Sequence, residues 1–456
     1  MTGDKLSMDD LNRLYRQIPK IDRLLAEKVF VGCNTALLTE AIRQEVELLR
    51  AAIGRGEVHE IDEEALKEAI LRRYGKMGRP SLRPLVNATG VIIHTNLGRS
   101  PIDPELFEEA RAVATGYCNL EYDLKAGRRG DRYTHTAAAL RELLGCEEAL
   151  IVNNNAAAVF LILNTFAQGK EAVVSRGELV EIGGSFRIPE VMAASGAKLV
   201  EVGTTNKTRL ADYEAAIGEE TAMLMKVHKS NYTIEGFCAE AAMEEIAALA
   251  RERGLIDYYD LGSAYLPELP WGLGAAEPSL PRILRDPPSL LSFSGDKLFG
   301  GVQAGIILGR KALIDRLKKN QILRMFRVDK VTLALLERTV LAYRRGETDK
   351  IPVLRMLFAT PEQLRNRAEA LRKRLPIPAK ILDSQTYVGG GTMPNRKIPT
   401  VILALEGEAQ ELEAAFRAHR IIGRIERDRF VLDMRTVREE DFETIIEAAE
   451  KIRNGH

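Results

Sequence analysis

From about residue 85 onward, short apolar segments alternate with longer amphipathic ones, and this alternation constrains the fold more than any other feature of the chain. The expected strands include "EALIVNNN" (148–155), "EAVVSRG" (171–177), "LIDYYDLGS" (255–263) and "SLLSFSGDK" (289–297). Strands separated by helices predict an α/β fold with a mostly parallel sheet. Several strands end in Asn, Gly, Ser or Asp, and the carboxyl ends of strands are where such folds bind ligands.

The chain is expected to divide into three domains joined by a linker. Residues 1–74 have apolar residues at helical spacing, which predicts a small helical domain. Residues 75–90 are typical of a linker, because basic residues, prolines and glycines gather between Leu71 and Pro84 without an acid. The main α/β domain is expected over 91–330, and a linker helix with a smaller α/β domain over 331–456.

Composition excludes several classes of protein. The chain has 65 basic and 65 acidic residues, so no general attraction to nucleic acid is expected and any contact with a polyanion must be local. Its four cysteines are scattered, which favours reduced thiols in a cytoplasmic protein over disulfides or a metal site. The N-terminus lacks an apolar signal segment, and the sequence has no apolar run long enough for a membrane span.

The turn after the strand at 148–152 is a candidate anion site. Asn154, Asn155 and Ala156 begin an apolar helical stretch, and free N–H groups at the start of a helix attract anions. An ordinary asparagine cap on the helix explains the same residues equally simply.

Two further features follow later strands. Asp260, or less favourably Asp257, stands where a carboxylate can accept a hydrogen bond from a protonated ring nitrogen, although a capping role is the simple alternative. Lys297 lies in "SFSGDKLFGG", where small neighbours leave room for a flat cofactor and Ser294 can contact its phosphate. A lone lysine is usually a surface residue, but a partly buried one forms a Schiff base more easily.

The order of these three features is more informative than any one of them. An anion-binding helix start, an acid at a strand end and a lysine in a Ser/Gly turn are the layout of pyridoxal 5'-phosphate enzymes of the aspartate aminotransferase fold (fold type I). The sequence therefore predicts this cofactor within domain 91–330, bound by Asn154, Asn155, Ala156, Asp260, Ser294 and Lys297.

Several long blocks resemble one family in particular, the bacterial selenocysteine synthases, or L-seryl-tRNA(Sec) selenium transferases. The blocks are "VNATGVIIHTNLGRSP", "YDLKAGRRGDRYTHT", "SRGELVEIGGSFRIPEVM", "VGTTNKT", "KVHKSNYTIEGF", "DLGSAYL" and "SFSGDKLFGGVQAG". The resemblance implies conversion of seryl-tRNA(Sec) into selenocysteinyl-tRNA(Sec) through a cofactor-bound aminoacrylyl intermediate, with selenophosphate as the selenium donor. Shorter related proteins lack the N-terminal helical domain, so its presence here favours a true synthase.

The resemblance also implies roles for individual residues. Lys297 would hold the cofactor and shuttle a proton, while Asp296 would assist departure of the hydroxyl or orient the cofactor. Arg176 would face the cofactor ring, and His228 and Asn231 would line the same pocket. The phosphate of selenophosphate would be held by three arginines, namely Arg99, Arg324 and Arg327, the last two sharing one helix face if that segment is helical.

Partners follow from the same resemblance. The N-terminal helices would recognise the tRNA by shape, the glycines at 389–391 would help form an open entrance, and the chain would form a homo-oligomer, a ring of dimers with shared active sites (a decamer). Two alternatives remain. A pyridoxal phosphate lyase or transferase acting on a free amino acid would need an arginine to clamp the carboxylate, and a non-catalytic tRNA-binding protein would need no cofactor.

Overall fold

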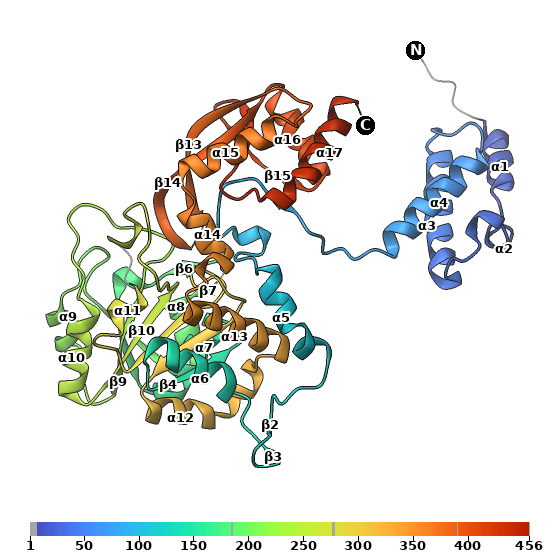
Figure 1. Cartoon of the computed structure of the whole chain (residues 1–456). Coiled ribbons are helices and arrows are strands. Elements are labelled where there is room, and N and C mark those ends of the chain that lie inside the picture. The colour runs from blue at the N-terminus through green and yellow to red at the C-terminus, as the bar shows by residue number, and fades with distance from the viewer. Residues whose placement is uncertain (1–6, 184–185, 276–278, 390, 456) are drawn as a thin grey trace. The chain divides into compact units, whose positions relative to one another are not determined.

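The computed structural model describes residues 7–183, 186–275, 279–389 and 391–455. The chain forms two compact units, residues 1–84 and 85–456 (Figure 1). No helix in the described part of the chain is long and apolar enough to cross a membrane.

The N-terminal unit is a helical bundle. Its elements are α1 (Met8–Gln17), α2 (Ile21–Leu25), η1 (Lys28–Phe30), α3 (Thr35–Gly54) and α4 (Glu63–Met77). Side chains of Ser7, Asn34 and Asp62 cap α1, α3 and α4, as expected at helix starts. Leu24, Ile42 and other apolar residues of these elements form the core of the unit. Helix α4 continues to Met77, beyond the residue at which the linker was expected to begin.

A seven-stranded sheet forms the centre of the second unit. Its order is β4 (Glu148–Val152), β12 (Gly305–Gly309), β11 (Leu290–Ser294), β10 (Ile256–Gly262), β9 (Thr221–Val227), β5 (Glu171–Ser175) and β8 (Lys198–Val202). Only β12 runs antiparallel to its neighbours. The mostly parallel sheet expected from the sequence is therefore confirmed.

Helices cover both faces of this sheet (Figure 1), because successive strand residues point to opposite faces. Leu150, Val174 and Met225 pack with α7 (Asn155–Phe166), α8 (Ile188–Ser195) and α12 (Lys311–Lys319). Ile151 and Val173 pack instead with α6 (Thr134–Leu144), α9 (Leu210–Ala215), α10 (Met243–Arg253), α11 (Leu280–Ile283) and α13 (Lys330–Arg345). Nearly continuous burial of the central strands follows from this double cover.

Shorter elements connect these layers. The first of them are η2 (Thr95–Leu97), α5 (Pro104–Thr115) and the small pairs β2 (Tyr122–Asp123) with β3 (Arg128–Arg129) and β6 (Glu181–Ile182) with β7 (Phe186–Arg187). The others are η3 (Arg176–Glu178), η4 (Leu273–Ala275), η5 (Gln321–Phe326), η6 (Thr348–Lys350) and η7 (Glu439–Asp441).

The C-terminal region is a smaller α/β domain with an antiparallel sheet in the order β13 (Ala379–Gly389), β14 (Thr392–Leu405), β17 (Arg429–Asp433) and β16 (Arg424–Glu426). Its helices are α14 (Pro352–Phe358), α15 (Pro361–Arg372), α16 (Ala409–Ala418) and α17 (Phe442–Arg453). Strand β1 (Val86–Asn87) pairs with β15 (Ile421–Ile422), and Val86 belongs to the core of this domain. Val86 and Ala88, which were expected in the linker, are thus part of a folded core.

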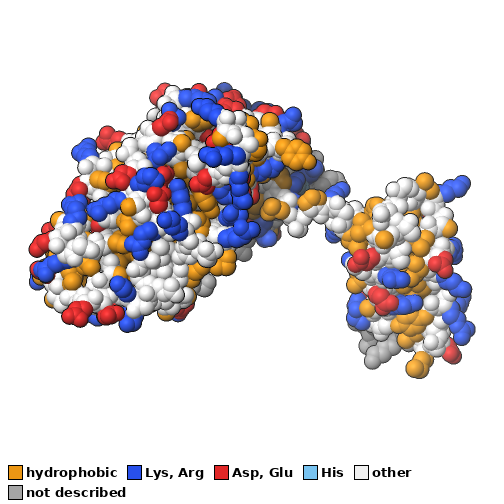
Figure 2. Space-filling view, turned by 90° about the horizontal axis from the view of Figure 1, so that it is seen from below, with side chains coloured by type: hydrophobic (Ala, Val, Ile, Leu, Met, Phe, Trp, Pro, Cys, Tyr) orange, Lys and Arg blue, Asp and Glu red, His pale blue; other side chains and the backbone are white. Residues whose placement is uncertain are grey.

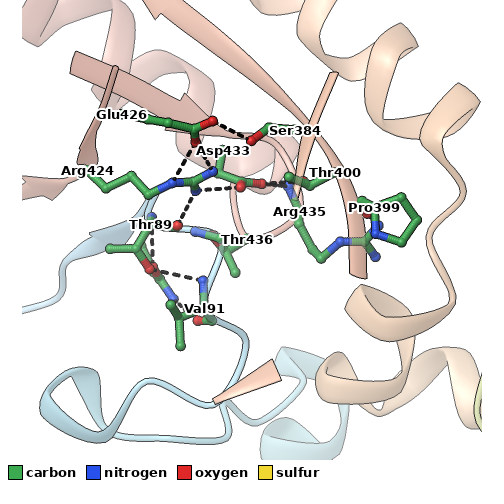
Figure 3. Close-up of polar contacts among 12 residues, drawn as sticks. Thr89, Val91, Ser384, Pro399, Thr400, Arg424, Glu426, Asp433, Arg435 and Thr436 are labelled. Carbon is green, nitrogen blue, oxygen red and sulfur yellow. Dashed lines mark hydrogen bonds and ion pairs between the residues drawn. The ribbon is translucent and has the colours of Figure 1, made fainter. Parts of the chain in front are cut away.

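A buried polar network holds the segment after β1 against the C-terminal domain (Figure 3). The Asp433 carboxylate accepts hydrogen bonds from Thr400 Oγ1, from Arg424 Nη1 at 2.6 Å and from the Arg435 amide at 2.9 Å. Gly90 lies against it with φ +84°, and a Cβ at that position would stand 2.2 Å from Asp433 Oδ2. Only glycine fits there, because the backbone at residue 90 lies directly against the Asp433 carboxylate.

Candidate active site

A cavity of about 460 Å³ lies at the carboxyl ends of the central strands. The segments that follow β4, β9, β10 and β11 all contribute to its wall. Its lining includes all six residues expected to bind the cofactor from the order of motifs, namely Asn154, Asn155, Ala156, Asp260, Ser294 and Lys297. The fold therefore brings together residues that are up to 143 positions apart in the sequence, from 154 to 297.

Lys297 is the central side chain of this cavity. It is 7 % exposed and follows β11 in a turn, and its Nζ donates to the Gly391 carbonyl at 3.3 Å. The glycines around it are required by space, since a Cβ at Gly295 would stand 2.7 Å from the Val302 carbonyl. Lys297 is thus a buried amine that faces a cavity.

Asp260, at the end of β10, is the acid that lines the cavity. Its Oδ1 accepts a hydrogen bond from Asn155 Nδ2 at 2.8 Å. Burial raises the pKa of Asp260 to about 6, although the charge of Lys297 and the bond from Asn155 oppose this shift. Asp257 is engaged elsewhere, because its carboxylate accepts from the amide of Ser289 at 2.8 Å and from the Ser289 hydroxyl.

The turn at Asn154 is both a helix cap and an anion-binding geometry. Asn154 Oδ1 accepts from the Ala157 amide at 2.9 Å, which is the capping bond of α7. The amides of Asn155 and Ala156, which precede Ala157 in the first turn of α7, have no acceptor within the helix. Gly305 on β12 approaches this turn closely, since a Cβ there would stand 2.2 Å from the Asn154 carbonyl oxygen.

Arg99 and Asp296 form an ion pair at the edge of the cavity. Arg99 Nη1 lies 2.8 Å from Asp296 Oδ2, and Asp296 is buried directly before Lys297. The backbone of Arg99 adopts φ 62°, a left-handed conformation that costs a non-glycine residue free energy. The arginine expected from the family resemblance is therefore at the site, but it already has a carboxylate partner.

Three expected residues do not line this cavity in their own chain. Arg176 donates to Glu201 at 3.0 Å and to the Gly203 carbonyl at 2.8 Å, so the structure does not support its expected place against the cofactor ring. Arg324 is exposed in η5, and Arg327 follows the end of that element. They do not share one regular helix face, because the helix ends at Phe326.

His228 and Asn231 do line the cavity. The pKa of His228 is lowered to about 4, mainly by burial, so its imidazole is neutral near pH 7. Asn231 Nδ2 donates to the Glu181 carbonyl at 2.7 Å. Of the glycines at 389–391, Gly391 lines the cavity and Gly390 lies outside the described residues.

Sequence reasoning did not assign several lining residues, among them Thr95, Phe186, Ser230 and Gln303. Ser230 and Gln303 stand inside quoted motifs, so their proximity to His228 and Lys297 in the sequence was the available signal. Thr95, in η2, and Phe186, in β7, also stand inside quoted blocks, but only the folded structure shows that they line the cavity.

Unsatisfied polar atoms indicate what this cavity holds. Asn155 Oδ1, Ser230 Oγ and Asn231 Oδ1 are buried and have no hydrogen-bond partner among the described residues. Buried polar groups without partners are rare in native proteins, so these atoms indicate a polar ligand. A lysine, an acid and free helix amides around about 460 Å³ fit pyridoxal 5'-phosphate in both size and chemistry.

Comparison with known proteins agrees with this geometry. Residues 85–438 match the family model described as L-seryl-tRNA selenium transferase. The chain belongs to this family. A relative from Nautilia profundicola is 59 % identical over 96 % of this chain and 98 % of its own length, and one from Sulfurimonas denitrificans is 52 % identical over 97 % and 99 %. Both carry the name L-seryl-tRNA(Sec) selenium transferase.

The solved structure of D-glucosaminate-6-phosphate ammonia-lyase has the same fold. It superposes with a TM-score of 0.59 at 22 % identity, and the match covers 83 % of this chain and 98 % of that one. The expected family and the mostly parallel α/β fold are thereby confirmed, and the expected enzyme class agrees with the selenium transferase family.

Proposed function

We propose that the protein converts L-seryl-tRNA(Sec) into L-selenocysteinyl-tRNA(Sec), with pyridoxal 5'-phosphate as cofactor and selenophosphate as selenium donor. The observation that carries this proposal is the cavity in which buried Lys297, Asp260 and the Asn155–Ala156 amides meet, in a chain of the selenium transferase family. The reaction replaces the serine β-hydroxyl by selenium and releases phosphate, so that atoms balance between seryl group plus selenophosphate and selenocysteinyl group plus phosphate.

Each residue at the cavity has a task toward the cofactor. Bound pyridoxal phosphate supplies an electron sink that eases loss of the α-proton and of the β-hydroxyl from serine. The amides of Asn155 and Ala156 would hold its phosphate. The carboxylate of Asp260 would accept from the ring N–H, and Lys297 would hold the aldehyde carbon covalently.

Proton transfer is assigned to Lys297. With the cofactor bound, the Lys297 amine would be the group that takes a proton from the substrate α-carbon and returns one. Asp296 precedes it, and its ion pair with Arg99 gives it a positioning role at the cavity edge. The second carboxylate oxygen of Asp296 is buried without a partner among the described residues, which leaves it one acceptor for an incoming group.

The selenophosphate site is proposed to be shared between subunits. Arg99 lines the Lys297 cavity, whereas Arg324 and Arg327 do not. A dimer in which Arg324 and Arg327 serve the cavity of the neighbouring subunit reconciles this placement with the role that the family resemblance implies for them. A homo-oligomeric ring of such dimers is part of the same proposal.

The N-terminal unit is proposed to bind the tRNA. Figure 2 shows Lys and Arg side chains gathered along one edge of the smaller of the two bodies drawn, which is this unit. Such an edge suits the phosphates of a folded RNA that is recognised by shape. A cytoplasmic location belongs to the same proposal, because aminoacylated tRNA is used there.

The lining of the cavity favours an esterified substrate over a free amino acid. Arg99 is the only arginine among the described lining residues, and this proposal assigns it to selenophosphate, which leaves no second arginine among those residues for a substrate carboxylate. A free amino acid would need an arginine to bind its carboxylate, whereas the serine of seryl-tRNA has none because the tRNA esterifies it. A non-catalytic tRNA-binding protein would not explain the buried lysine and acid.

The test is replacement of Lys297 by alanine. Wild-type protein is expected to be yellow, to lose its cofactor absorbance on borohydride treatment, and to convert seryl-tRNA(Sec) when selenophosphate is supplied. Lys297→Ala should abolish the absorbance and the conversion, while Lys311→Ala, at a lysine whose side chain is 62 % exposed, should change neither. Turnover by Lys297→Ala, or turnover of free serine without tRNA by the wild type, would refute the proposal.

A further inference from the structure

A second cavity of about 360 Å³ lies beside the first. Its wall combines residues 97–104 of the large domain with α14, α15 and residues 435–441 of the C-terminal domain. Arg99 lines both cavities. The two cavities are therefore neighbours, and the segment around Arg99 lies between them. The Arg99 side chain of this segment forms the ion pair with Asp296.

Arginines dominate the charge of this second cavity, which we call the arginine cavity. Five arginines line it, namely Arg99, Arg355, Arg367, Arg435 and Arg438. Three acids also line it, namely Glu439, Glu440 and Asp441. Three of the arginines have carboxylate partners, which are Asp296 for Arg99, Asp103 for Arg355 and Asp441 for Arg438.

Arg435 is fully buried and has only neutral partners. Its guanidinium donates to the carbonyls of Met356 at 2.6 Å and Ala359 at 3.2 Å, and to that of Pro399 (Figure 3). Its Nε is buried without a partner among the described residues. Asp433 accepts the backbone amide of Arg435, not its guanidinium.

Arg367, on α15, likewise donates only to backbone carbonyls. Its Nη1 donates to the carbonyls of Met434 at 2.9 Å and Val437 at 3.2 Å, and its Nε is buried with no partner in the described part of the chain. Burial lowers the pKa of Arg367, and it lowers that of Arg435 to about 10, although the charges of Glu439 and Asp433, respectively, oppose these shifts. Arg435 is fully buried and Arg367 is half-buried, and neither guanidinium contacts a carboxylate among the described residues, so the arginine cavity is suited to receive an anion from outside.

We propose that the arginine cavity binds a phosphodiester near the 3' end of the substrate tRNA. This rests on the proposed function, because only a seryl-tRNA substrate carries a phosphodiester within one nucleotide of the serine bound at Lys297. The serine ester is on the terminal ribose, so the adjoining phosphate must lie beside the Lys297 cavity, which is where the arginine cavity is. Guanidinium groups bind phosphate oxygens through paired hydrogen bonds.

The remaining lining suits a nucleotide better than a bare ion. Ile92, Leu97, Ile102, Pro352 and Val437 give the cavity apolar surface for a ribose or a base. The cavity, at about 360 Å³, is also larger than a single phosphate ion needs. For comparison, one water molecule takes about 30 Å³ in the liquid. Free phosphate, or the phosphate group of selenophosphate, has the same chemistry, and the experiment below separates these sources.

The test compares two RNAs and four proteins. The RNAs are deacylated tRNA(Sec) with its complete 3' end and the same RNA without its last three nucleotides. The proteins are the wild type, Arg367→Gln, Arg367→Lys and Arg372→Gln, all as full-length holoenzyme. Arg372 is the matched control, because it is an exposed arginine on the same helix outside the cavity.

In the wild type, removal of the 3' nucleotides should weaken binding about tenfold or more, the effect of losing a charge-assisted hydrogen bond to phosphate. Arg367→Gln should bind the complete RNA about tenfold more weakly and the shortened RNA unchanged, with a raised KM for seryl-tRNA and little change in kcat. Arg367→Lys should recover part of the loss, and Arg372→Gln should match the wild type.

Several results would overturn the inference. One is an equal effect of Arg367→Gln on both RNAs, and another is a change confined to the KM for selenophosphate or to inhibition by inorganic phosphate, which would assign the cavity to the free anion. Unchanged thermal unfolding and cofactor absorbance of Arg367→Gln exclude a folding defect, and Arg355→Gln offers a second variant. Because RNA binding is measured without turnover, failure here is distinct from failure of the Lys297→Ala test of the proposed function.

Discussion

Replacing Asp260 by asparagine should make the cofactor-free protein more stable while impairing the enzyme. Asparagine keeps the shape of the side chain and can still accept the hydrogen bond that Asn155 donates at 2.8 Å. It removes only a negative charge that burial disfavours. Active sites commonly hold groups that cost stability and are retained for function.

The pKa of Asp260 sets the size of this effect. It stands at about 6 in the folded protein against 3.8 for an ordinary aspartate, a difference of about 2 pKa units. Each unit corresponds to about 1.4 kcal/mol, so the ionised carboxylate costs the folded state about 3 kcal/mol well above pH 6. Because the folded pKa is raised, this cost appears as pH rises from about 4 to 6, and at pH 5 about half of it remains.

The assay measures the free energy of unfolding of the cofactor-free protein at pH 8 and at pH 5, with unfolding monitored as the loss of secondary structure. Asp260→Asn should be stabilised by up to about 3 kcal/mol at pH 8 and by about half as much at pH 5. Asp257→Asn is the matched control on the same strand: two bonds from Ser289 satisfy its carboxylate, so asparagine there should destabilise the protein at both pH values. Equal stabilisation of Asp260→Asn at the two pH values, or none, would refute the reasoning.

With cofactor bound, the same Asp260→Asn variant should convert seryl-tRNA about 10 to 100 times more slowly, because a hydrogen bond between charged groups contributes about 1.5–3 kcal/mol; turnover at the wild-type rate would contradict the role given to Asp260. Gly305→Ala should weaken cofactor binding in an absorbance titration, since its Cβ would stand 2.2 Å from the Asn154 carbonyl oxygen and displace the turn at the start of α7. His228→Gln should leave the shape of the pH–rate profile between pH 6 and 8 unchanged, because the pKa of His228, at about 4, lies below that range. If active sites are shared, mixing inactive Lys297→Ala and Arg324→Gln subunits should restore part of the activity, and no restoration would contradict the shared site.

The cofactor cavity was largely predictable because its chemistry follows strand ends. Asn154, Asp260 and Lys297 each come directly after an apolar strand, and parallel strands place such positions on one edge of a sheet. The sequence does not show which strands are neighbours. Asn155 reaches Asp260 although β12 and β11 separate β4 from β10 in the sheet, a contact that depends on the start of α7 lying above that edge.

Arg176 shows why position after a strand is not enough. It follows β5, as a cofactor ligand would, but β8 lies next to β5 in the sheet and brings Glu201 and Gly203 within hydrogen-bond distance. The edge position of β8 is a property of the whole topology and has no local signal in the sequence. The arginine cavity also has no local signal in the sequence, since Arg367 and Arg435 come to line one cavity with Arg99 only through the packing of two domains.

Arg99 connects the two halves of the proposed chemistry. Its left-handed backbone, at φ 62°, is a conformation that surrounding contacts must maintain, and its ion pair with Asp296 is one such contact. Because Asp296 precedes Lys297, any anion that draws Arg99 away from Asp296 alters the surroundings of the reactive amine. Selenophosphate on one side of Arg99 and a tRNA phosphodiester on the other would compete with Asp296 for the same guanidinium. Binding of one anionic substrate is therefore expected to change the affinity for the other, and by linkage the two effects must be equal in size.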